Sequence, residues 1–128
     1  MILADSSVWI QLLSEPQAAA MASQLDRLAT CGPVLQEVLQ GLRDQPSARR
    51  VRRDFLALPR LSDPTPAALF VAAAEIYRQG RAQGFTLRSS TDCLIAAIAI
   101  ENLVPVWHRD RDFDTIARFT SLRVLHVD

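Results

Sequence analysis

An uninterrupted run of apolar residues extends from Cys93 to Ile100. A helix that is apolar on every side is a buried helix, and this run is too short to span a bilayer, which takes roughly 20 apolar residues. Ser90, Thr91 and Asp92 precede the run and are residue types that cap helix N-termini. The pattern therefore predicts a core helix, ending at about Asn102, with an acidic residue at its N-terminal end.

Short apolar segments elsewhere alternate with helical patterns. Strands are expected at Met1–Asp5, Ala29–Cys31, Leu58–Leu61, Val104–Trp107 and Leu122–Val127, and helices at Ser6–Leu13, Gln17–Leu28, Pro33–Gly41, Ser47–Leu58, from Pro66 to Gly80 or Gly84, and around Phe113–Ala117. Pro105 indicates that its strand lies at a sheet edge or begins there. Strands separated by helices, with no hairpin signal, predict an α/β fold with a parallel sheet.

Length and composition favour one folded domain that spans residues 1–128. The apolar fraction of 49% is sufficient for a core. Cys31 and Cys93 lack the spacing of metal ligands, so we expect two buried hydrophobic side chains. The first residues show no basic region followed by an apolar run, which predicts no signal peptide, no membrane span and a cytoplasmic location.

The charged residues balance to a net charge of zero, and every basic residue other than histidine is arginine. Zero net charge argues against strong non-specific attraction to nucleic acid. Arginine suits phosphate and carboxylate recognition. The absence of lysine excludes any mechanism that requires a lysine side chain.

Three acidic residues fall where strands end or where the core helix begins. Asp5 ends the first strand, Asp110 follows the Val104–Trp107 strand, and Asp92 opens the core helix. Ligands of open parallel sheets bind at the carboxyl ends of the strands. We therefore expect these carboxylates to converge at one end of the sheet.

Each candidate also has a structural interpretation when taken alone. Asp5 serves equally well as a helix cap, and for Asp92 a cap is the stronger interpretation, with a contribution of roughly 0.5–2 kcal/mol. Periodicity places Glu37 away from the inner face of its helix, as a solvated residue. The segment Asp110–Asp114 suits a capped helix start, and a lone histidine such as His108 is more often structural than a ligand.

In combination, however, these motifs resemble the PIN-domain family, and in particular its VapC branch of toxins from type II toxin–antitoxin systems. The matching segments, in order and over essentially the whole chain, are Asp5-Ser6-Ser7, Glu37-Val38-Leu39-Gln40-Gly41, Arg88-Ser89-x-x-Asp92-Cys93-Leu94-Ile95-Ala96-Ala97 and Asp110-x-Asp112-Phe113. The resemblance implies an α/β/α sandwich, with three layers and a short parallel sheet. It also implies a metal site formed by Asp5, Glu37, Asp92 and Asp110, to which Asp112 adds a further acid.

One departure from the family pattern concerns His108. Threonine or serine commonly stands at this position before the last acidic motif, so the resemblance leaves the surroundings of Asp110 open. We hypothesise that His108 contacts metal or phosphate directly. Ser6, Arg88 and Arg109 are the other candidates for contact with substrate.

The implied activity is that of an endoribonuclease that depends on Mg²⁺, with Mn²⁺ as a substitute. Sites made only of carboxylates select such hard cations, and crowded carboxylates without a cation raise one another's pKa. Hydrolysis by an activated water would leave 5′-phosphate and 3′-hydroxyl ends. The arginines from Arg49 to Arg53 are interpreted as a solvated helix face rather than as an RNA-binding surface.

The resemblance further implies two protein partners. One is a cognate antitoxin of the VapB type that blocks the acidic site, and the other is a second copy of the chain in a homodimer. Periodicity locates neither interface.

Three other functions are compatible with a chain of this length that carries acids at strand ends. A phosphoacceptor receiver domain uses a lysine, which this chain lacks. A haloacid-dehalogenase-type phosphatase needs Asp-x-Asp after the first strand, where this chain has Ser7 as the third residue. A PIN scaffold that binds RNA or protein without cleaving it remains the main alternative, although the presence of all four acids argues against it.

Overall fold

The computed structural model describes residues 1–14, 25–43 and 48–126 and contains a parallel sheet of four short strands. The strands are β1 (Ile2–Ala4), β2 (Leu28–Ala29), β3 (Val106–His108) and β4 (Val124–His126). They lie in the order β2-β1-β3-β4, and every neighbouring pair is parallel. The carboxyl ends of all four strands therefore point the same way.

The centre of the sheet is a fully buried pair of strands. Leu3 in β1 pairs with Val106 in β3, and both side chains are inaccessible to solvent. Pro105 immediately precedes β3, and its carbonyl accepts a hydrogen bond from the Leu3 N–H at 3.0 Å. Because β3 lies between β1 and β4, Pro105 marks a strand start, and the alternative that its strand lies at an edge is wrong.

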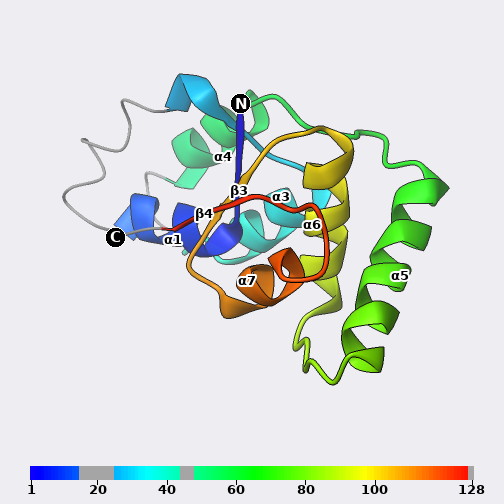
Figure 1. The fold of residues 1–128 in the computed structure, drawn as a ribbon. Coiled ribbons are helices and arrows are strands. Elements are labelled where there is room, and N and C mark those ends of the chain that lie inside the picture. Colours follow the sequence, from blue (N-terminus) through cyan, green and yellow to red (C-terminus); the bar gives the residue numbers. More distant parts are fainter. Residues whose placement is uncertain (15–24, 44–47, 127–128) are drawn as a thin grey trace.

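Helices cover the sheet on both sides. They are α1 (Ser6–Ser14), α3 (Gly32–Gln40), α4 (Ala48–Leu56), α5 (Ala67–Ala82), α6 (Ser90–Glu101) and α7 (Arg111–Ala117), with a short 3₁₀ turn η1 at Leu25–Arg27. In Figure 1, α5 and α6 lie side by side to the right of the strands, and α4 lies behind β1. The three-layer α/β/α arrangement expected from the sequence is confirmed.

Helix α6 is the core helix that the apolar run predicts. Its side chains from Cys93 to Ala99 are buried with the exception of Leu94, which is partly buried. The N-cap is Ser89, whose hydroxyl accepts a hydrogen bond from the Asp92 N–H at 3.3 Å. Asp92 therefore lies in the first turn of the helix and is not its cap, so the capping interpretation of Asp92 is wrong.

Most of the predicted elements are present, with ends shifted by one or two residues. The predicted helix Gln17–Leu28 lies largely outside the described residues, and its last residue, Leu28, belongs to strand β2. The predicted strand Leu58–Leu61 is reduced to a single bridge between Thr30 and Arg60. Within the described ranges, no helix combines the length and apolarity needed to cross a membrane.

Candidate functional site

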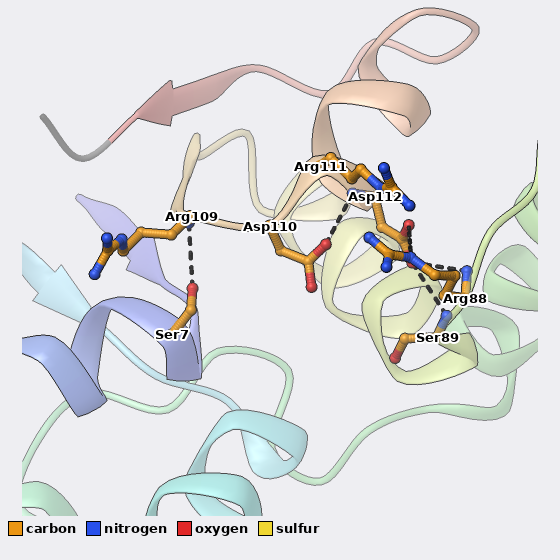
Figure 2. Close-up of a pocket in the computed structure, with 7 residues that line it drawn as sticks. All are labelled: Ser7, Arg88, Ser89, Arg109, Asp110, Arg111 and Asp112. Atoms are coloured by element: carbon orange, nitrogen blue, oxygen red, sulfur yellow. Dashed lines mark hydrogen bonds and ion pairs between the residues drawn. The ribbon is translucent and has the colours of Figure 1, made fainter.

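A polar pocket lies beyond the carboxyl ends of β1 and β3. Its lining comprises Ser7, Arg88, Ser89, Arg109, Asp110, Arg111 and Asp112. Figure 2 shows Asp110 between two groups of side chains, with Ser7 and Arg109 on one side and Arg88, Ser89 and Asp112 on the other. The N-terminal ends of α1, α6 and α7 therefore meet at this pocket.

Three carboxylates form the centre of the site. Asp92, Asp110 and Asp112 each place one carboxylate oxygen within 4.8 Å of the others. Asp92 and Asp112 are buried, whereas Asp110 is partly exposed toward the pocket. Carboxylates this close repel one another when they are ionised, and a bound cation would offset that repulsion.

Asp110 is held by two hydrogen bonds that leave one of its oxygens free. As the N-cap of α7, it accepts a hydrogen bond on Oδ1 from the Asp112 N–H at 2.9 Å. Its own backbone N–H donates to Nδ1 of His108 at 3.0 Å. Oδ2 therefore remains available to a ligand in the pocket.

Asp112 connects the two helices that contribute acids. Its Oδ2 accepts hydrogen bonds from the backbone N–H groups of Arg88 at 2.9 Å and Ser89 at 3.1 Å (Figure 2). Asp112 thus fixes the start of α6, which carries Asp92, against the start of α7. This connection explains how Asp92 and Asp110, 18 residues apart in sequence, come together.

Asp5 combines the two roles considered for it. Its Oδ2 accepts from the Ser7 N–H at 3.3 Å and from the Ser7 hydroxyl at 2.8 Å, as a cap of α1 does. Its Oδ1 is buried and has no hydrogen-bond partner. One oxygen therefore caps the helix while the other is available to a ligand.

Glu37 is not the solvated residue that periodicity predicts. The side chain is half-buried, and its Oε1 is fully buried with no hydrogen-bond partner. Burial raises the pKa of Glu37, and the charge of Asp5 adds to this effect, while a hydrogen bond with Ser6 lowers it. Helix α3 thus directs Glu37 toward the other acids, although it lies outside the group of three closest carboxylates.

Among the acids of the site, Asp92 has a strongly raised pKa. Burial raises its pKa from 3.8 to about 8, and the charges of Asp5, Asp110, Asp112 and Glu37 act in the same direction. The expectation that crowded carboxylates raise one another's pKa is confirmed for Asp92 and Glu37. A cation would relieve this repulsion.

The donor groups fit a hard divalent cation. Asp5, Glu37 and Asp92 each have a buried carboxylate oxygen without a hydrogen-bond partner, which is a costly arrangement unless a further group binds there. All of these donors are carboxylates, the ligand type preferred by Mg²⁺ and Mn²⁺. Asp110 would add its free oxygen.

The predicted contacts with substrate divide into two groups. Arg88 and Arg109 line the pocket, as expected, while Ser6 is buried beside Glu37. His108 is 1% exposed and its Nε2 faces Asp114 at 3.2 Å, which argues against the predicted contact between His108 and substrate. Burial lowers the pKa of His108, although the charge of Asp114 opposes this effect.

Three pocket residues were not among the candidates drawn from the sequence. Ser7 anchors Asp5, Ser89 caps α6, and Arg111 adds a third guanidinium at the rim. Ser7 and Ser89 belong to the segments that match the PIN-domain motifs, so those motifs were the sequence signal for them. Arg111 carried no signal beyond its position between two acids.

Comparison with known proteins agrees with this arrangement. The family model described as PIN domain matches residues 2–119. Ribonuclease VapC11 of Mycobacterium tuberculosis and the VapC ribonuclease Mb1587 of Mycobacterium bovis are each 39% identical over 130 residues, which cover 96% of both chains. In the structure of VapBC2 from Rickettsia felis bound to a DNA fragment, the matching chain has a TM-score of 0.76 at 16% identity, with full coverage of both chains. The structure of VapBC-5 from Mycobacterium tuberculosis gives a TM-score of 0.67 at 23% identity, over 98% of this chain and 97% of the other.

Proposed function

Because this chain belongs to the PIN-domain family, we propose that it is a metal-dependent endoribonuclease and the toxin of a VapBC-type toxin–antitoxin pair. The observation that carries the proposal is the cluster of Asp92, Asp110 and Asp112 at the carboxyl ends of the parallel strands, together with the buried, unpartnered oxygens of Asp5 and Glu37. Relatives of similar length are named as ribonucleases, which supports the same activity.

The acids would act together as ligands of the cation. Asp5, Asp92 and Asp110 each offer one carboxylate oxygen that accepts no hydrogen bond. Glu37 supplies a fourth such oxygen. When bound, Mg²⁺ or Mn²⁺ supplies Lewis-acid activation of water and neutralisation of charge on a phosphodiester. The protein's own contribution is to hold these oxygens in place through Ser7, Ser89 and Asp112.

Arginines at the rim would hold the RNA backbone. Arg88 and Arg111 lie on the Asp112 side of the pocket, and Arg109 lies on the Ser7 side (Figure 2). A strand that crosses the pocket would place phosphates on both sides of the acids. Guanidinium groups suit this contact because they bind phosphate oxygens through two parallel N–H bonds.

The non-catalytic scaffold makes a different use of the same fold. A scaffold has no need for buried carboxylate oxygens without partners, which destabilise a metal-free protein. Burial, together with the neighbouring charges of Asp5, Asp110, Asp112 and Glu37, raises the pKa of Asp92, so its ionised form is disfavoured without a cation. These features favour the nuclease.

Two protein partners belong to the proposal, an antitoxin of the VapB type and a second copy of this chain, both within the cytoplasm. Exposed apolar side chains support protein docking, among them Phe70 and Val71 on α5, with 53% and 61% exposure. Light scattering at micromolar concentration should show a dimer, and a monomer alone would contradict that part of the proposal.

The chemistry of the product ends tests the proposal. Purified protein is incubated with total cellular RNA and Mn²⁺, and the fragments are mapped and their ends identified. Hydrolysis by activated water predicts 5′-phosphate and 3′-hydroxyl ends. Primary products with 2′,3′-cyclic phosphate would contradict this mechanism.

A further inference from the structure

A second cluster of polar side chains lies behind the acidic site, on strands β3 and β4. His108 and His126 are register partners in these parallel strands, so their side chains extend from the same face of the sheet. Their rings are 5.1 Å apart, and Asp114 of α7 lies over them. Oδ1 of Asp114 is 2.7 Å from Nε2 of His126 and 3.2 Å from Nε2 of His108.

The hydrogen bond at Nδ1 defines the state of the His108 ring. Nδ1 accepts from the Asp110 N–H at 3.0 Å, which requires a lone pair on this nitrogen. A neutral ring with that lone pair carries its proton on Nε2, which lies 3.2 Å from Oδ1 of Asp114 without forming a hydrogen bond of good geometry. The ring is therefore bonded to the backbone of the acidic site through Nδ1, while its Nε2 lies beside Asp114 in the first turn of α7.

The same three groups have the ligand types of a zinc site, but this hydrogen bond argues against zinc. A histidine bound to metal through Nε2 keeps its proton on Nδ1 and donates it to an acceptor. In His108 the Nδ1 atom faces a backbone N–H instead. A metal at Nε2 would therefore place two hydrogens against each other.

Asp110 depends on this contact for its orientation. The residue is extended, with φ −111° and ψ 127°, at the turn between β3 and α7. Its N–H is held by His108 and its Oδ1 by the Asp112 N–H, so that two bonds direct Oδ2 to the pocket. His108 is itself 1% exposed and packs on Phe113, with ring centres 5.2 Å apart, so the acceptor has little freedom to move.

We propose that His108 is a positioning residue for the metal site: its Nδ1 fixes the Asp110 backbone, and burial of the ring against Phe113 holds that nitrogen in place. This inference rests on the proposed function, because it assumes that Asp110 binds the cation. Groups that orient a metal ligand typically contribute about 10–100-fold to metal affinity.

The test compares His108→Thr with His108→Val in the full chain. The two side chains have the same shape and leave the same cavity, but only threonine has a hydroxyl that can accept from the N–H two residues on. Mn²⁺ affinity is measured by calorimetric titration of metal-free protein, and thermal unfolding is recorded for each variant. His126→Ala removes the exposed end of the cluster as a control, and Asp92→Asn reports on the metal site itself.

We expect His108→Val to bind Mn²⁺ about 10–100-fold more weakly than wild type. His108→Thr should recover much of that affinity although its melting temperature is lowered as in the valine variant, and His126→Ala should bind like wild type. Equal Mn²⁺ affinities for the threonine and valine variants would overturn the inference. Failure of wild-type protein to bind Mn²⁺ at a site sensitive to Asp92→Asn would instead contradict the proposed function.

A measurement on wild-type protein covers the case in which neither His108 variant folds. The nitrogen NMR signals of the His108 ring should show Nδ1 without a proton and Nε2 with one. A proton on Nδ1 would overturn the inference, as would tight Zn²⁺ binding that is lost in His126→Ala.

Discussion

The carboxylate of Asp112 accepts a hydrogen bond from the backbone N–H of Arg88 at 2.9 Å, across 24 residues of sequence. The same oxygen accepts from the Ser89 N–H. A side chain that is 2% exposed therefore holds the loop before α6 against the start of α7. The relative positions of Asp92 and Asp110 depend on this contact.

Replacement of Asp112 by alanine should destabilise the protein by about 1–3 kcal/mol, because two backbone N–H groups lose their acceptor. Asp112→Asn retains an acceptor oxygen at the same place and should lower the free energy of unfolding by less than the alanine variant does. Urea unfolding measures both variants. Equal losses of unfolding free energy for the two would show that the N–H bonds are not the source of the effect.

The raised pKa of Asp92 makes the stability of metal-free protein depend on pH. The native state keeps a proton up to a pKa of about 8 that the unfolded chain releases near 3.8. The free energy of unfolding should therefore fall as pH rises from about 4 to about 8. Glu37, whose pKa is also raised, contributes in the same direction.

Calorimetry in the presence of chelator at pH 5 and pH 8 measures this dependence. Wild-type protein should melt at a higher temperature at pH 5, Asp92→Asn should show a smaller difference, and Mn²⁺ should raise the melting temperature of wild type most at pH 8. The same pH dependence in wild type and Asp92→Asn would show that Asp92 is not the source.

Helix α6 should be the most sensitive helix to loss of side-chain volume. Ile95 is inaccessible to solvent, so Ile95→Ala should cost about 2–5 kcal/mol through lost burial and the cavity it leaves. Val71 on α5 is 61% exposed, so Val71→Ala should change stability by about 0.5 kcal/mol or less. A similar loss from both substitutions, measured by urea unfolding, would contradict the assignment of α6 as the core helix.

The arginines of α4 provide a test of where RNA binds. Arg49, Arg50, Arg52 and Arg53 are exposed, and Asp54 lies within 4.0 Å of Arg50 and Arg53. As a solvated face, this helix should tolerate Arg49→Glu with Arg53→Glu without a change in the salt dependence of RNA affinity. Arg88→Gln should reduce the slope of log RNA affinity against log salt concentration by about the amount that one phosphate contact contributes. A reduced slope for the α4 variant would place RNA on that helix.

The order of the elements and the identity of the acids could be predicted from the sequence. Apolar runs mark β1, β3 and α6, and acids follow or precede them at the end of the sheet where ligands bind. Glu37 could not be placed by periodicity, because it lies off the apolar face of α3 and yet its Oε1 is buried near the charge of Asp5. Only the resemblance of Glu37-Val38-Leu39-Gln40-Gly41 to the family motif indicated its role.

The role of His108 also lay beyond the sequence. Sequence spacing shows that His108 precedes Asp110 by two residues, but not which ring nitrogen faces the backbone. The direction of the side chain follows from β3 and β4 being parallel and from Asp114 covering them. Those spatial relationships can be predicted only when the order of the strands in the sheet is known.

The most direct test of the central claim is RNA cleavage by wild-type protein and by Asp92→Asn, with Mn²⁺ and with chelator. Glu101→Gln, an exposed acid at the other end of α6, is the matched control. We expect discrete fragments with wild type and Glu101→Gln in Mn²⁺, and none with chelator or with Asp92→Asn. Cleavage that persists in chelator, or in folded Asp92→Asn at the wild-type rate, would contradict the claim.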